Sequence, residues 1–361
     1  LRTRRQRQMC IRDRYGRKAK SILEDCRDSI LKSLNAKGWK LVFTSCGSES
    51  NNLALKGIQN IDCTFVSSIE HDSVIKANSN IQLIKVSKEG LIDLENLESM
   101  LEKTEGKKLI SVMLACNETG IIQPIKEIVK IAKKYDCVVH SDASQALGKI
   151  QVDVEDLGVD LLTIASHKIG GPQGASALLF RKNIILDAMI KGGGQEESLR
   201  SGTENIMAIA GFAKACEISI EKLDLYVKHC SQLRDYLEEK IQGYSYDTII
   251  FGKNLLRLPN TTYFTMPNVH NQIQLIQFDL KQIAISTGSA CSSGKVSSSK
   301  ILKSMGVKDD IAKTAIRVSF SAENTKGEVD FFIETWKAIF DRSNLHKACL
   351  LYTSPSPRDK T

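Results

Sequence analysis

The sequence predicts an α/β protein: a mostly parallel β-sheet in a large domain, followed by a smaller C-terminal α/β domain. Two observations indicate this class. Short apolar segments of strand length alternate with amphipathic segments of helix length along most of the 361 residues. Polar side chains suited to catalysis also recur just after these apolar segments, and ligands of parallel sheets bind beyond the carboxyl ends of the strands.

In the first half of the chain the alternation begins with a helix over Tyr15–Ala36. The elements that follow are the strand Leu41–Phe43, the helix from Asn52 to about Gln59, the strands Cys63–Ser67 and Leu109–Cys116, the helix Ile125–Lys134, and the strands Cys137–His140 and Val159–Ala165. Strands separated by helices of this length predict a parallel sheet covered on both faces.

The small residues between Thr44 and Asn52 predict a turn that leads from a strand into a helix. Such a turn directs backbone N–H groups and the Ser48 hydroxyl at whatever lies beyond the helix, and phosphate suits that position. A simple helix N-cap is the alternative for Ser48, and this segment alone favours it.

Lys168 follows an apolar strand within the segment IASHKIGGPQG. Burial lowers the pKa of a lysine, and a neutral amine forms a Schiff base with an aldehyde such as pyridoxal phosphate (PLP). An exposed loop lysine is the alternative. Four other polar residues also lie just past predicted strand ends, which favours a site: Ser48, His71, Asn117 and Asp142.

After a flexible, partly cationic loop at Gly192–Asn205, a helical pattern runs from about Glu204 to Gln242 with a break inside it. The elements expected beyond it are the strands Thr261–Met266, Gln274–Leu280 and Ala284–Ser286, the helix Ser298–Met305, the strand Ala315–Phe320 and the helix Lys326–Phe340. We expect a large domain over 15–223 and a small one over 224–349.

Composition excludes several classes. Hydrophobic residues make up 42% and charged residues 25% of the chain, as in ordinary globular proteins. No apolar run approaches the roughly 18 residues of a membrane span, so we expect no membrane partner. Ten cysteines without zinc-site spacing predict free thiols, no metal site and a cytoplasmic location, or a mitochondrial one in a eukaryote.

The net charge of +8 lies mostly at the ends: residues 1–14 carry +5 and residues 350–361 carry +1. A basic arm can bind nucleic acid or act as a presequence. Both ends, with MCIRDR and YTSPSPRD, instead look like translated sequencing-adapter fragments. We exclude both from the fold and expect no direct nucleic-acid partner.

Cys291 lies among small polar residues, STGSACSSG, which predict an exposed loop and a thiol available for chemistry. The stretch Gly288–Val296 approaches a nucleotide-binding P-loop. However, it has five residues rather than four between its glycines, and Val296 stands where a hydroxyl must bind magnesium. We therefore exclude a nucleoside triphosphatase.

Together these residues resemble the class V branch of fold-type I PLP enzymes, and more closely the group I (NifS/IscS-type) cysteine desulfurases. The resemblance covers about Tyr15–Phe340 and includes these motifs in order: FTSCGSESNNLALKG, EHDSV, NETGIIQPI, HSDASQALGKI, SHKIGGPQG, GGGQEESLRSGT, STGSACSSGK and IRVSFS. It implies a seven-stranded-type, mostly parallel sheet in the PLP-binding domain and a small domain with the catalytic-cysteine loop.

The resemblance also implies roles around the PLP ring. Lys168 matches the Schiff-base lysine that later takes the substrate Cα proton. Asp142 matches the carboxylate that keeps the pyridinium nitrogen protonated, so that the ring can draw electrons. His71 matches the imidazole stacked on the ring, and Gln145 matches the residue that hydrogen-bonds the phenolic oxygen. A solvated turn carboxylate and a structural histidine are the alternatives for Asp142 and His71.

For the phosphate, the matching residues are Gly47, Ser48, Ser166, His167 and, from the neighbouring subunit of an implied homodimer, Thr203. The family usually has a serine where this chain has Ala165, so Ser166 replaces it or one hydrogen bond is lost.

For the reaction, Asn117 and Arg317 match the clamp on the substrate carboxylate, a structural ion pair being the alternative for Arg317. The resemblance implies that L-cysteine gives up its sulfur to Cys291, leaving L-alanine and an enzyme persulfide. The sulfur then passes to an acceptor protein such as an iron–sulfur scaffold.

Two alternatives stay open. One is a selenocysteine lyase or another class V PLP enzyme. The other is an inactive, truncated relative that acts only by binding partners, because MCIRDR stands where the family has an active-site segment with an asparagine-alanine-threonine motif.

Overall fold

The computed structural model describes residues 13–288 and 299–352. They divide into two compact units. The first holds the chain up to Asn117 together with Ile121–Leu225, and the second holds Glu118–Gly120 together with the chain from Tyr226 onward. The expected domain boundary at 223/224 stays a prediction.

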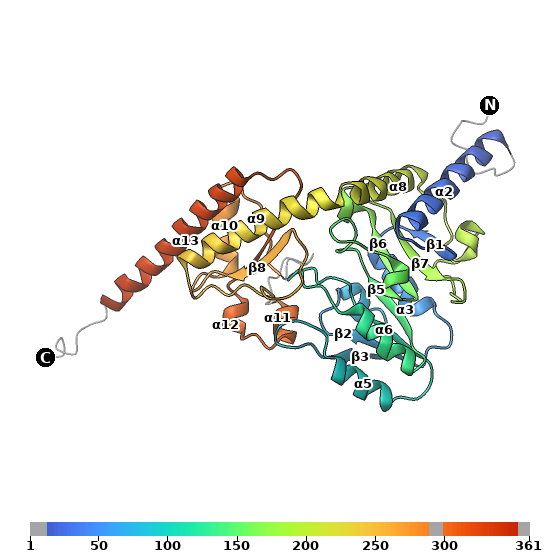
Figure 1. Ribbon diagram of the computed structural model, residues 1–361, viewed down its shortest axis with the longest axis horizontal. Helices are drawn as coiled ribbons and strands as arrows, with labels where there is room; N and C mark the ends of the chain where they lie inside the picture. The colour runs from blue at the N-terminus through green and yellow to red at the C-terminus, as the bar shows by residue number, and fades with distance from the viewer. Residues whose placement is uncertain (1–12, 289–298, 353–361) are drawn as a thin grey trace. The chain divides into compact units, whose positions relative to one another are not determined.

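The described part of the first unit is built on a seven-stranded sheet (Figure 1). In spatial order its strands are β1 (Trp39–Thr44), β7 (Ser176–Arg181), β6 (Leu161–Ala165), β5 (Val138–Asp142), β4 (Lys108–Ser111), β2 (Cys63–Ser67) and β3 (Ile81–Ile84). Strand β7 is antiparallel to both of its neighbours, β1 and β6. The other adjacent pairs are parallel. The predicted mostly parallel sheet is confirmed.

Helices cover this sheet, and α8 lies beside α2 (Figure 1). The helices of the unit are α2 (Arg14–Ser33), α3 (Gly47–Gly57), α4 (Asp72–Ile75), α5 (Leu94–Glu102), α6 (Ile125–Lys134), α7 (Val154–Leu157) and α8 (Ile206–Glu221), with the 3₁₀ turns η1 (Ser166–Ile169) and η2 (Gln195–Ser198). Every residue of β2, β4, β5 and β6 is buried, as expected of strands packed on both faces.

Helix α3 begins at Gly47, earlier than the predicted start at Asn52. Its N-cap is Cys46, which makes no side-chain capping bond. The alternative N-cap role for Ser48 is therefore wrong, since Ser48 lies in the first turn of the helix. The predicted turn of small residues is largely helical.

The second unit contains a two-stranded antiparallel sheet of β8 (Thr261–Thr265) and β9 (Ala315–Ser319). Its helices are α9 (Leu223–Tyr244), α10 (Asn271–Asp279), α11 (Lys300–Ser304), α12 (Asp309–Ala312) and α13 (Lys326–Tyr352). Aliphatic and aromatic residues together form its core, where Phe278 stacks on Phe332 with ring centroids 4.6 Å apart. Over the described ranges, no helix combines the length and apolarity needed to cross a membrane.

Two expectations about helices have opposite outcomes. The predicted break in the long helical pattern is confirmed at Lys222, which separates α8 from α9. The predicted strand Gln274–Leu280 is wrong, because this segment lies in α10. Gln274 and Phe278, four positions apart, are both fully buried, which is the spacing of one helix face.

Candidate active site

Strand direction brings most of the predicted site residues to one edge of the first unit's sheet. Strands β1 and β6 run the same way because both are antiparallel to β7, and β2, β4 and β5 are parallel to β6. Their carboxyl ends therefore share an edge. The polar residues at or after these ends are Ser48, His71, Asn117, Asp142 and Lys168.

Asp142, the last residue of β5, is 8% exposed and its carboxylate is held by two donors. The Asn51 side-chain amide donates to Oδ2 at 2.8 Å, and the Ser144 backbone N–H donates to Oδ1 at 2.9 Å. Hydrogen bonds to both oxygens fix the direction in which the carboxylate points.

The same Asn51 amide also connects Asp142 to His71. Asn51 Nδ2 donates to Ser73 Oγ at 2.9 Å, and Ser73 Oγ lies 2.8 Å from His71 Nδ1. His71 is exposed, and its Nδ1 also accepts the Ser73 backbone N–H at the start of α4. The imidazole is thus oriented by its own helix while its other edge faces outward.

Two titratable groups lie buried behind Asp142. Burial lowers the pKa of His140 to about 4, against the opposing effect of the Asp142 charge. Its ring bridges Ser111 and Thr163 at 2.8 and 3.0 Å. Burial raises the pKa of Glu70 well above its usual range, and one of its oxygens accepts the Met113 N–H at 2.7 Å. At neutral pH the His140 imidazole is uncharged and adds no positive charge beside the Asp142 side chain.

Gly47, the first residue of α3, packs closely against the ends of β5 and β6. A Cβ atom added there would lie 3.3 Å from Ser144 Oγ and 3.7 Å from Ala165 Cβ. The Ser144 hydroxyl is buried without a hydrogen-bond partner. A helix N-terminus beside an unsatisfied hydroxyl suits an anion, while Ala165 contributes a methyl group where a serine would bring a second hydroxyl.

Ser166, His167 and Lys168 lie together in η1, directly after β6. Ser166 is fully buried, its hydroxyl packs against Gly171, and its Oγ has no hydrogen-bond partner. His167 and Lys168 are both exposed, contrary to the buried setting expected for Lys168. Partial burial and the nearby Lys168 charge lower the pKa of His167.

Gln145 follows Asp142 by three residues and is half-buried. Its side-chain oxygen accepts a hydrogen bond from Lys149 Nζ at 3.0 Å. Because Lys149 occupies the amide oxygen, the N–H₂ group of the Gln145 side chain is the end that points away from Lys149.

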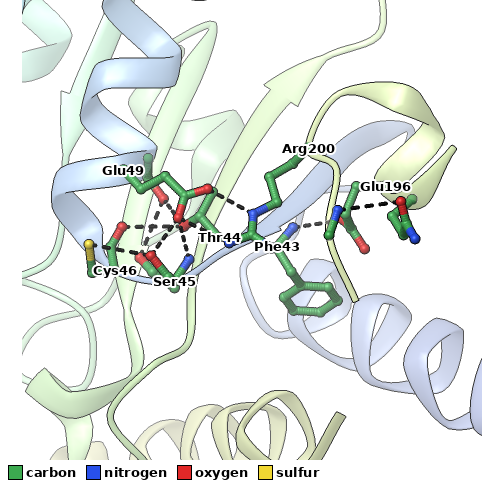
Figure 2. Close-up of polar contacts among 11 residues, drawn as sticks. Phe43, Thr44, Ser45, Cys46, Glu49, Glu196 and Arg200 are labelled. Atoms are coloured by element: carbon green, nitrogen blue, oxygen red, sulfur yellow. Dashed lines mark hydrogen bonds and ion pairs between the residues drawn. The ribbon is translucent and has the colours of Figure 1, made fainter. Parts of the chain in front are cut away.

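Thr203 is exposed in the loop between η2 and α8. Two ion pairs join this part of the chain to earlier elements, one from Arg200 in the loop to α3 and one from Glu196 in η2 to α2. Arg200 pairs with Glu49 of α3 at 2.9 Å, and Figure 2 shows Glu49 also accepting from Ser45. Glu196 accepts the Phe43 N–H at 2.8 Å and pairs with Arg27 through two bonds of 2.9 Å. Hydrogen bonds from Arg200 and Ser45 keep the pKa of Glu49 below its usual range, although burial opposes them.

The residues predicted to bind substrate and sulfur belong to different parts of the chain. Arg317, half-buried on β9, belongs to the second unit and is opposite Tyr263 of β8. Asn117 belongs to the first unit and Cys291 lies outside the described residues.

Sequence reasoning did not single out Asn51, Ser73 or Ser144, although each touches the Asp142 network or the Gly47 contact. Asn51 stands in the motif FTSCGSESNN and Ser73 in EHDSV, so both residues could have been found through the motifs. The contact of Asn51 with Asp142 joins residues 91 positions apart, and local patterns do not show it.

Comparison with known proteins agrees with this arrangement. Residues 11–332 match the family described as Aminotransferase class-V. The chain therefore belongs to the class-V aminotransferase family.

Within that family, the similar proteins are named cysteine desulfurases. Cysteine desulfurase IscS of Dictyoglomus turgidum is 36% identical over 340 residues, covering 91% of this chain and 86% of that protein. Cysteine desulfurase IscS 1 of Archaeoglobus fulgidus is 38% identical over 340 residues, covering 91% and 88%. Among solved structures, a NifS-like protein from Rickettsia africae aligns with a TM-score of 0.85 and 40% identity, covering 91% of both chains.

Proposed function

We propose that this protein is a PLP-dependent cysteine desulfurase, which converts L-cysteine to L-alanine and keeps the sulfur as a persulfide on Cys291. One observation carries the proposal: Lys168, the Asp142 carboxylate and the glycine-led start of α3 meet at one edge of the sheet. The names of the relatives at 36% and 38% identity support the same reaction.

The residues at this edge fit PLP. The start of α3, with Gly47, Ser48 and the unsatisfied Ser144 hydroxyl, suits its phosphate, joined by His167 and by the η1 backbone at Ser166. Gln145 suits the phenolic oxygen. When bound, PLP supplies an electron-withdrawing ring that stabilises negative charge on the substrate Cα.

Three residues of this chain then act on the ring and the substrate. Asp142, held by Asn51 and the Ser144 N–H, keeps a proton on the ring nitrogen because its negative charge favours the pyridinium. His71 would pack on the ring face and fix its orientation. Lys168 Nζ holds the cofactor and takes the proton from the substrate Cα.

Substrate binding and sulfur transfer involve three further residues. Asn117 and Arg317 bind the substrate carboxylate, for which a guanidinium offers two parallel donors. The Cys291 thiolate takes the substrate sulfur, so that a new S–S bond forms as the carbon–sulfur bond breaks.

We further propose a homodimer in which Thr203 reaches the phosphate of the neighbouring subunit, and a sulfur-acceptor protein such as an iron–sulfur scaffold. The proposed location is the cytoplasm, or the mitochondrion in a eukaryote. Seven cysteines within the described ranges are free thiols, which agrees with a reducing compartment.

The test is production of alanine from cysteine by the PLP-loaded protein, with cofactor binding followed by visible absorption. Lys168→Ala should abolish both the visible absorption and alanine production, because the amine that holds the cofactor is gone. Cys291→Ser should keep the absorption and lose sulfide release. Undiminished sulfide release from Cys291→Ser, or a folded parent protein that stays colourless with PLP, would contradict the proposal.

A competition between cysteine and selenocysteine separates the two substrates. A desulfurase uses both or prefers cysteine, whereas turnover of selenocysteine alone identifies a selenocysteine lyase.

A further inference from the structure

Glu118 lies in the second unit and is 5% exposed, which is unusual for an acidic side chain. The segment Glu118–Gly120 packs against residues at the start of β8. The Leu258 N–H donates to the Gly120 carbonyl at 2.8 Å, and a Cβ added at Gly120 would lie 3.2 Å from Thr261. The Glu118 backbone is therefore fixed within this unit, and its side chain has a defined direction.

The Glu118 carboxylate contacts residues on both sides of the segment 289–298. On one side, Ser299 Oγ donates to Glu118 Oε2. Ser299 is the N-cap of α11, where its hydroxyl also accepts the Leu302 N–H at 3.0 Å. The carboxylate is thus bound to the residue that begins α11.

On the other side, Gly288 packs directly on the same carboxylate. A Cβ added at Gly288 would overlap Glu118 Oε2 and the Tyr263 hydroxyl, so no other residue fits there without a shift. The chain leading to Gly288 is fixed as well, because Ser286 exchanges two backbone hydrogen bonds with Arg317 of β9, at 3.1 and 2.7 Å.

An apolar side chain could fill this space without the cost of burying a carboxylate. Burial raises the pKa of Glu118 to about 7, against hydrogen bonds from Ser299 and Tyr263 and the charge of Arg317. A group that is costly to bury, yet hydrogen-bonded to Ser299 and packed against Gly288, 181 and 170 positions away in the sequence, indicates a role in holding these two residues together.

We propose that Glu118 is a positioning residue that joins Gly288 and Ser299, and thereby fixes both ends of the segment that carries Cys291. This inference rests on the proposed function, in which Cys291 receives the sulfur. Glu118 touches neither substrate nor cofactor in it. Holding Gly288 and Ser299 in place is expected to favour sulfur transfer, because preorganisation lowers the entropy cost of bringing the reacting groups together.

The first experiment measures amide hydrogen exchange on the full chain at Ser286 and Leu302, one amide for each end. Glu118→Ala should speed exchange at both by about tenfold or more, because each end loses a contact. Ser299→Ala should speed exchange at Ser286 as well, although Ser286 is on the other side. Glu118→Gln, which keeps an oxygen for Ser299, should restore slow exchange.

The matched control is Glu238→Ala. Glu238 is also buried in the second unit and pairs with Arg257 through bonds of 2.8 and 2.9 Å, so its loss has a comparable cost to folding. It should leave exchange at Ser286 and Leu302 unchanged. Equal acceleration by Glu238→Ala would overturn the proposal, as would unchanged exchange at either end in Glu118→Ala.

The second experiment mixes PLP-loaded protein with cysteine in a single turnover and follows persulfide on Cys291 by mass spectrometry. Glu118→Ala should slow persulfide formation by about 10- to 100-fold. The change in cofactor absorption on adding cysteine and the alkylation of Cys291 by iodoacetamide should stay at the parent rate or rise. Faster exchange with parent-like persulfide formation would make Glu118 structural only and overturn the positioning role. Absence of persulfide in the parent contradicts the proposed function instead. The exchange measurement still tests whether Glu118 joins Gly288 and Ser299.

Discussion

At the scale of single residues, Glu118 is a buried carboxyl group that titrates near neutral pH. Its pKa in the folded chain is about 7, compared with an ordinary value of 4.5, and burial is the main cause. Between these two values the folded state keeps a proton that the unfolded state has lost. Stability therefore falls as pH rises from about 4.5 to about 7, by an amount on the order of 3 kcal/mol.

Glu118→Gln should remove this pH dependence, because the amide carries no charge at any pH in the window. Above pH 7 the variant should be more stable relative to the parent than it is at pH 4.5. The measurement is urea unfolding of the second unit at several pH values. Trp336 fluorescence reports it in a Trp39→Phe background, since the chain has 2 tryptophans and Trp336 lies in the second unit. A difference between variant and parent that stays constant from pH 4.5 to above 7 would contradict the cause given for this pKa.

At the scale of elements, the 3₁₀ turn η2, which precedes the loop that carries Thr203, combines a buried ion pair with an unfavourable backbone conformation. Glu196 and Glu197 both have positive φ angles, 47° and 55°. The Glu196 side chain is 1% exposed and pairs with Arg27, whereas that of Glu197 is 72% exposed and pairs with Lys40. Two neighbouring glutamates thus share a backbone conformation and differ in burial.

Glu196→Ala should lower the free energy of unfolding of the first unit by about 3–5 kcal/mol, because Arg27 and the Phe43 N–H lose their buried acceptor. Glu197→Ala, the matched control, should cost no more than about 1 kcal/mol. Denaturant unfolding followed by Trp39 in a Trp336→Phe background measures both. Equal costs would show that the buried Glu196–Arg27 pair contributes no more to stability than the exposed Glu197–Lys40 pair.

The elements also show how far the sequence predicts the fold and the site. The apolar runs before Asp142 and Lys168 placed both residues at the sheet edge, because a strand buried on both faces is a strong local pattern. The strand prediction for Gln274–Leu280 is wrong, since its alternating polar and apolar residues resemble a strand as much as one face of α10. The start of α3 was placed too late because small residues mark turns and helix starts alike.

The site shows a different limit. Asn51 lies in helix α3, where no local pattern distinguishes it from its neighbours, and its contact with Asp142 spans 91 positions. The motif NETGIIQPI contains Glu118, but the local sequence does not show its contacts, because its partners Gly288 and Ser299 lie far along the chain. Long-range hydrogen bonds of this kind leave no periodic pattern in the sequence.

At the scale of the whole molecule, the proposed homodimer makes each site depend on two chains. Lys168→Ala removes the amine of its own site, whereas Thr203→Val removes a hydroxyl from the neighbour's site. Each variant alone should have little or no activity. Mixed and allowed to exchange subunits, the two should regain about a quarter of the parent activity, because half of the dimers then contain one intact site.

The measurement is alanine production before and after mixing, with a Lys168→Ala and Cys291→Ser mixture as the control. Absence of recovery, in a mixture shown to contain mixed dimers, would mean that Thr203 serves its own chain.

The central claim is that sulfur passes from cysteine to Cys291 at a site organised by Lys168 and Asp142. The most direct measurement is the mass of the peptide containing Cys291, after PLP-loaded protein has reacted once with cysteine. We predict a gain of one sulfur atom on this peptide, with one alanine released for each, and no gain in Lys168→Ala. Alanine release with the sulfur found on a different cysteine, or on none, would contradict the account.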